Sequence, residues 1–157
     1  MKKRFVITIV ALILGAYCAQ AQSQVLAPFT AAENARHMTF SQKQFKLLRN
    51  LMGLDRETRR MLDAMDVKSM EVLDMGACSE SDRNAAKEAV RAAGKADGSY
   101  DIREGAPKGT EMYLLTSGET VTGLLVLIEE PGKDDTLIMS ISCNAPFDKI
   151  AAMAQQR

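Results

Sequence analysis

Histidine is almost absent from this chain of 157 residues: there is one, His37. A Ser-His-Asp site needs a histidine placed beside both a nucleophile and a carboxylate, and a lone histidine is more often structural or exposed. The Gly-x-Ser-x-Gly sequence that carries the nucleophile of many hydrolases is also missing. The sequence therefore predicts no catalytic residue.

Nucleotide-binding and metal-binding patterns are missing as well. Neither Gly-x-x-x-x-Gly-Lys-Ser/Thr nor Gly-x-Gly-x-x-Gly occurs. One histidine and widely separated cysteines lack the close ligand pairs of a zinc site, so we expect no metal and no cofactor. Basic and acidic residues number 20 each. This balance lacks the basic footprint that nucleic-acid binding requires.

Cysteine is scarce too, with Cys18, Cys78 and Cys143 the only three. Cys18 lies in a segment that we expect to be removed, which leaves a pair. In an oxidising compartment such a pair can form a disulfide. Closing the loop between Cys78 and Cys143 would stabilise the protein by about 4 kcal/mol in the chain-entropy model. The alternative is two buried thiols that never meet.

What the chain does have is an N-terminal export signal. Residues 2–4 are basic, residues 5–15 are apolar apart from Thr8, and Ala19-Gln20-Ala21 has the small-x-small pattern of a cleavage site. We therefore predict a signal peptide over residues 1–21, cleaved between Ala21 and Gln22.

Two other interpretations fit this segment less well. A transmembrane anchor needs about 20 apolar residues, and this run is too short, so we expect no membrane span in the mature chain. Cys18 could instead be the lipid attachment site of a lipoprotein, but Tyr17 stands where such a signal has a small residue. We expect an exported protein, in the periplasm or associated with the outer envelope.

The mature part is long enough for one domain. It has 136 residues (157 minus 21), and 46% of the whole chain is hydrophobic. Residues 22–36 are polar and rich in alanine, and we expect them to form a flexible leader. Residues 37–157 are predicted to form a single domain.

Apolar residues spaced three or four apart predict helices. In residues 41–54 this face is Phe45, Leu48, Leu51 and Met52, with Ser41 as N-cap and Gly53 as the stop. The other predicted helices cover residues 55–64, a stretch from Ser79 or Ser81 to Gly94, and residues 147–155.

Five further segments favour strands: residues 67–75, 100–103, 110–116, 121–128 and 136–143. Ser117-Gly118 is a hairpin signal, and Pro131-Gly132 marks a second turn. Strands joined by short turns must be antiparallel. The predicted fold class is α+β, with an antiparallel sheet of four or five strands and helices packed on one face.

Three segments resemble an exported family of Gram-negative cell envelopes, catalogued as domain of unknown function 4252. They are residues 39–48 (TFSQKQFKLL), residues 123–130 (GLLVLIEE), and residues 137–144 (LIMSISCN) followed by FDKI at 147–150. Cys143 stands where the family would have glycine. The resemblance implies an envelope location and one compact α+β domain. It implies no catalytic residue, because the family's own function is unknown.

Acidic and basic clusters suggest weaker candidate sites. Asp97 to Asp101 is interpreted as a turn, because it lacks the ligand ladder of a calcium loop. Four carboxylates near a hairpin could bind calcium or a basic partner, but a charged turn that blocks edge aggregation is the favoured interpretation. They are Glu129, Glu130, Asp134 and Asp135.

Arginines and methionines form two more candidate surfaces. Arg56, Arg59 and Arg60 share a helix face that could contact an anion, although a solvated face is favoured. The ten methionines could form an adaptable binding surface, but core-like positions favour gap-filling for most of them.

Two functional hypotheses follow. The first is a non-enzymatic envelope protein that binds another envelope protein or stabilises an assembly. The second is a small periplasmic ligand-binding protein or hydrolase with a site of scattered carboxylates and hydroxyls. A shallow apolar surface or open sheet edge favours the first, and a polar pocket with facing carboxylates favours the second.

Overall fold

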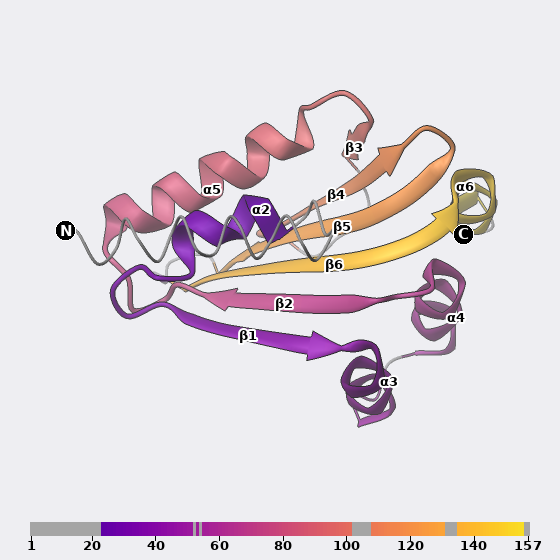
Figure 1. Ribbon diagram of the computed structural model, residues 1–157, viewed down its shortest axis with the longest axis horizontal. Coiled ribbons are helices and arrows are strands. Elements are labelled where there is room, and N and C mark those ends of the chain that lie inside the picture. The colour runs from indigo at the N-terminus through magenta and orange to yellow at the C-terminus, as the bar shows by residue number, and fades with distance from the viewer. Residues whose placement is uncertain (1–22, 52, 54, 102–107, 131–134, 156–157) are drawn as a thin grey trace.

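A six-stranded antiparallel sheet, in the order β1-β2-β6-β5-β4-β3, is the centre of the computed structural model (Figure 1). The structure describes residues 23–157 other than 52, 54, 102–107, 131–134 and 156–157. The predicted signal peptide, Cys18, the Ala21–Gln22 cleavage site and the Pro131-Gly132 turn therefore lie outside the described residues. The strands are β1 (Arg36–Ser41), β2 (Ser69–Asp74), β3 (Ser99–Asp101), β4 (Thr110–Ser117), β5 (Thr120–Glu129) and β6 (Thr136–Pro146). The helices are α2 (Ser23–Leu26), η1 (Ala27–Phe29), α3 (Gln42–Leu51), α4 (Arg56–Met65), α5 (Glu80–Gly94) and α6 (Phe147–Gln155).

The predicted α+β class is confirmed, but the sheet has six strands rather than four or five. The strand that the sequence did not indicate is β1. All of its residues except Phe40 are exposed. Its apolar alternation is limited to Met38 and Phe40, which is too short a pattern to reveal an edge strand.

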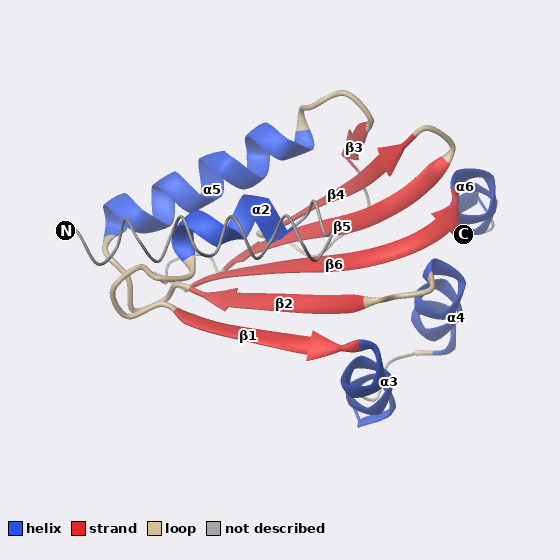
Figure 2. Cartoon of the chain, viewed as in Figure 1, coloured by secondary structure: helices blue, strands red, loops and turns tan. Residues whose placement is uncertain are grey.

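Helices cover both faces of the sheet, so the prediction of one covered face is wrong. One core cluster joins Val72 and Ile141 of the sheet to Phe45 of α3, Met65 of α4 and Ile150 of α6. A second cluster packs alternate strand residues against Leu26 of α2 and against Ala86 and Val90 of α5. Because successive side chains of a strand point to opposite faces, these clusters lie on opposite sides of the sheet. Figure 2 shows α5 and α2 along one face, with α3, α4 and α6 together at one end.

The expected flexible leader is also corrected. From Ser23 onward it forms α2 and η1, and Leu26 is fully buried. Val25 and Phe29 pack against the same cluster. Three apolar residues spaced along a short polar segment are enough to hold it on the sheet, although their spacing is too brief to show helical periodicity.

Helix α5 forms as the sequence predicts. The Ser79 hydroxyl accepts a hydrogen bond from the backbone N–H of Asp82 at 3.2 Å, which caps the first turn. At the other end, buried Gly94 lies against the ring of Tyr113. The small side of the helix therefore lets its backbone approach the sheet closely.

Helix α3 carries the inner residues Phe45 and Leu48, as expected, but Leu51 is wrongly placed on that inner face. Leu51 is 76% exposed, and Leu47, one turn before it, is 64% exposed. On α4, Met61, Leu62 and Met65 pack inward.

Candidate functional site

A row of apolar side chains crosses five strands on the face shared with α3, α4 and α6. Its members are aligned by strand pairing, and we call the row the methionine face: Met38 of β1, Val72 of β2, Met139 of β6, Val126 of β5 and Met112 of β4. Met38 is 48% exposed, while Met112 and Met139 are partly buried. The row therefore alternates three methionines with two buried valines, and its exposure is greatest at Met38, at the β1 end.

The position of the row explains why it is accessible. The helices of this face lie at the end of the sheet where β1 finishes and β2 begins (Figure 1). Met38 is three residues before the end of β1, or about 10 Å along the strand. No helix in the described part of the chain is placed over that region of the sheet. Leu137 and Ile128, paired in the next row, extend the partly exposed apolar surface.

The methionines are thus of two kinds. Met65, Met70 and Met75 are buried and fill the core, as the favoured interpretation predicts. Met38 does not fill the core, since almost half of its surface is exposed. Methionine is flexible and polarisable, so a surface lined with it adapts to different apolar side chains.

The outer edge of β1 adjoins this surface. Strand β1 is the last strand of the sheet on its side, and it pairs only with β2 among the described strands. An edge strand offers unpaired backbone groups to an added strand. Met38 therefore belongs to both the apolar row and the open edge.

The opposite face carries the lone histidine. The His37 Nε2 lies 3.8 Å from Oε1 of Glu71 on the neighbouring strand. The Glu71 Oε2 is buried and has no hydrogen-bond partner. Burial raises the pKa of the Glu71 carboxyl above its ordinary value, and His37 opposes that rise.

Hydroxyl groups flank Glu71, but their order does not suit nucleophilic catalysis. Thr39 and Ser140 are its partners on the two neighbouring strands. The carboxylate strand thus lies between the histidine strand and the strand of Ser140. A catalytic triad needs the histidine between its acid and its nucleophile. Two strand spacings and an offset of two residues along the strand place the backbones at His37 and Ser140 about 12 Å apart.

Cys78 and Cys143 are both free and both buried, so the possible disulfide between them is not formed in the structure. They belong to different core clusters, and the sheet separates those clusters. The Cys143 thiol donates to the carbonyl of Val121 at 3.7 Å. Burial raises the pKa of the Cys143 thiol to about 11, and burial also raises that of Cys78. The structure contains the alternative, two protonated thiols that never meet.

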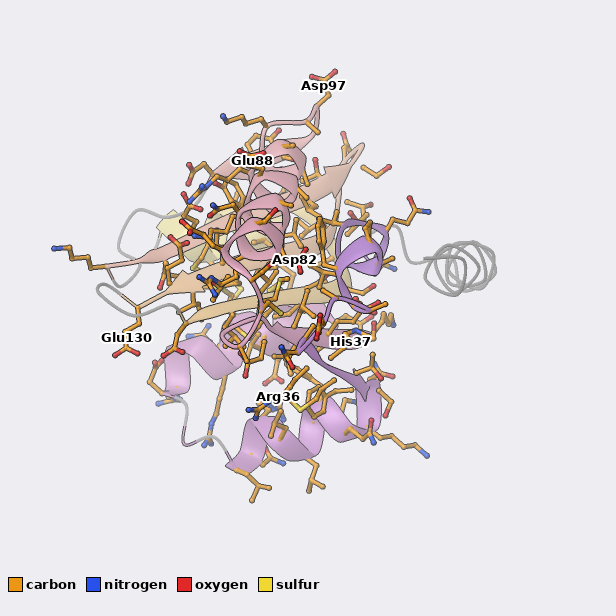
Figure 3. All side chains as sticks on the ribbon, turned by 90° about the vertical axis from the view of Figure 1, so that its left-hand side faces the viewer. Arg36, His37, Asp82, Glu88, Asp97 and Glu130 are labelled. Atoms are coloured by element: carbon orange, nitrogen blue, oxygen red, sulfur yellow. The ribbon has the colours of Figure 1, made fainter. Side chains whose placement is uncertain are left out.

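The described carboxylates near the β5–β6 hairpin, Glu129, Glu130 and Asp135, do not gather into a metal-binding group. Glu129 forms ion pairs with Lys87 and Arg91 of α5, and the Arg91 Nε lies 3.0 Å from an oxygen of Glu111. Glu130 points away from the body of the protein (Figure 3), and Asp134 lies outside the described residues. Glu129 thus helps to fasten α5 to the sheet.

Other predicted candidates are dispersed. Asp97 and Gly98 form a turn, with a φ of +82° at Gly98, but the rest of the predicted turn, Ser99–Asp101, is strand β3. Arg56, Arg59 and Arg60 are all exposed on α4. Over the described ranges, no three histidine, cysteine, aspartate or glutamate residues gather closely enough to hold a metal ion.

None of the described helices combines the length and the apolar character needed to cross a bilayer. No protein-family model, curated protein or solved structure matches the chain. The resemblance to the envelope family therefore stays a prediction, and the methionine face and the His37–Glu71 pair rest on the geometry of this chain alone.

Proposed function

We propose that the protein is a non-enzymatic module of the cell envelope that binds another envelope protein through the methionine face. The observation that carries this proposal is the row of partly exposed methionines aligned across the sheet. Burying exposed apolar surface against a partner contributes about 25 cal/mol of favourable free energy for each Å² buried. A partner that presents apolar side chains recovers that free energy.

The arrangement on the opposite face supports binding rather than catalysis. Glu71, and not the histidine, occupies the middle strand, so a proton cannot pass from Ser140 through His37 to a carboxylate. The unpartnered oxygen of Glu71 does favour a second candidate function, the binding of a small ligand that donates hydrogen bonds. The hydroxyls of Thr39 and Ser140 are next to it in the sheet.

Export is part of the proposal and is supported by the composition of residues 1–21. We expect the chain recovered from an envelope fraction to begin at Gln22, measured by mass spectrometry of the intact protein and its N-terminal peptide. A lipid-modified Cys18 as first residue would make the protein a lipoprotein. An intact Met1 in the soluble cell extract would contradict export.

Photocrosslinking in cells tests the proposed partner. A photoreactive amino acid at position 38 is expected to capture a discrete protein, since Met38 lies on the apolar row and is 48% exposed. The matched control is position 100, because Tyr100 is 49% exposed but lies on β3 at the other edge of the sheet. The adducts are identified by mass spectrometry.

The proposal requires capture from position 38 and not from position 100. Capture is also expected to fall on substituting Met112→Glu, which places a charge on the same row while leaving the crosslinker untouched. Equal capture from both positions, or none from position 38, contradicts a partner on the methionine face. Ligand screening at Glu71 then becomes the next experiment.

A further inference from the structure

The outer face of α3 exposes two leucines beside lysines. Leu47 and Leu51 are four positions apart in the sequence, so they lie on one stripe of the helix and are both exposed. Lys43 is one turn earlier on the same stripe, and Lys46 is adjacent; both are exposed. Phe45 and Leu48 already provide the contacts with the core. The leucines of the outer stripe are therefore not needed to fasten the helix to the sheet.

Positive charge gathers around these leucines. Residues 42–65, which contain α3 and α4, hold six basic and three acidic residues, a net charge of +3. The other residues after position 22 hold 11 basic and 17 acidic residues, a net charge of −6. Arg49 of α3 pairs with Asp63 of α4, so the helices are joined. The exposed Arg56, Arg59 and Arg60 of α4 extend the basic surface.

We propose that this surface, the α3–α4 basic hairpin, docks on an anionic lipid surface. Leucines on such a helix insert shallowly at the boundary between headgroups and acyl chains, and nearby lysines and arginines engage lipid phosphates. Both helices lie at one end of the molecule (Figure 1), and the net negative charge belongs to residues outside them.

A lipid surface fits these observations better than a protein does. A stable protein interface buries about 800 Å² on each partner and needs matched shapes. Two leucines flanked by flexible lysines provide neither a broad apolar area nor a fixed outline. A bilayer requires only shallow apolar insertion together with several cations, and that is what this hairpin presents.

Flotation of the processed chain with lipid vesicles tests the proposal. We expect binding to mixed phosphatidylglycerol–phosphatidylcholine vesicles that weakens as salt is raised, and much weaker binding to phosphatidylcholine alone. The double substitution Leu47→Ser/Leu51→Ser is expected to lower the partition coefficient about tenfold. Lys43→Gln/Lys46→Gln is expected to lower it as well and to reduce its dependence on salt.

The matched control is Met38→Ser, which removes an exposed apolar side chain from the methionine face and is expected to leave vesicle binding unchanged. Circular dichroism establishes that each variant is folded, as expected for exposed positions. Equal binding by the leucine variant and the unsubstituted chain overturns the proposal. The lipid-docking proposal is also overturned if the chain does not bind anionic vesicles but binds an acidic polypeptide. That result would identify the partner as a protein.

Discussion

Substitution Gly94→Ala is expected to lower the free energy of unfolding by about 2 kcal/mol, because overpacking a closed contact costs about 1–3 kcal/mol. A methyl group at this position would lie closer than 3.0 Å to three ring atoms of Tyr113. Tyr113 is 3% exposed and lies between α5 and the sheet, so its ring has little room to move. The expected fall in the melting temperature is about 6 °C.

A double-mutant cycle separates this clash from other effects of alanine. In a Tyr113→Leu background the added methyl group has more space, so Gly94→Ala should cost much less there. Chemical denaturation of the four proteins measures the coupling, which we expect to exceed about 1 kcal/mol. If Gly94→Ala has the same effect in both backgrounds, the close approach of α5 to β4 does not depend on Gly94.

The second large effect is expected from Glu71→Gln, which should stabilise the protein at neutral pH by about 1 kcal/mol. The ionised Glu71 has a buried oxygen without a hydrogen-bond partner, and burial raises the pKa of its carboxyl. A carboxyl whose pKa is higher in the folded state favours folding most when protonated. The unsubstituted protein therefore loses stability as the pH rises through the folded pKa of Glu71.

The advantage of Glu71→Gln should accordingly disappear below the ordinary glutamate pKa of 4.5, where both forms of residue 71 are neutral. His37 faces Glu71 at 3.8 Å and lowers the pKa of the Glu71 carboxyl, against the larger effect of burial. Thermal melts across this pH range measure the effect. Glu88→Gln, at an exposed position on α5, serves as control and should change stability by less than about 0.5 kcal/mol. A destabilised Glu71→Gln variant at neutral pH would show that the carboxylate has a stabilising partner.

A stabilising substitution at Glu71 would also bear on the second candidate function. Groups that reduce stability in the unliganded protein are found at binding sites, because the ligand supplies the missing contact. If Glu71→Gln stabilises the chain but leaves the crosslink from position 38 intact, the two faces of the sheet act separately.

The elements with strong local patterns could be predicted from the sequence. Strand β5 is central in the sheet, and its residues are nearly all apolar. Ser79 is an N-cap residue, which marks the start of α5. The hairpin at Ser117-Gly118 forms as expected, with a φ of +60° at Gly118. These features depend on residues a few positions apart, so they can be predicted from the local sequence.

The methionine face could not be predicted in the same way. Met38, Met112 and Met139 lie on three strands far apart in the sequence, and only strand order and register align them. The sequence gives no signal for the place of β6 between β2 and β5. For Leu51, the spacing from Leu48 and Met52 fitted an inner face as well as an outer one, and packing against the sheet decided the outcome.

The place of β6 has a consequence for the order in which the protein can be built. Strand β6 joins the β1–β2 pair to the β5–β4–β3 group, yet it follows all the other described strands in the sequence. During synthesis, which proceeds from the N-terminus, one edge of β2 stays unpaired until the residues of β6, up to Pro146, have been made. Pairings between such distant segments form slowly and leave strand edges exposed meanwhile. Strand β6 therefore completes the sheet. A chain truncated before β6 would contain the β1–β2 pair and the β5–β4–β3 group with no strand to join them.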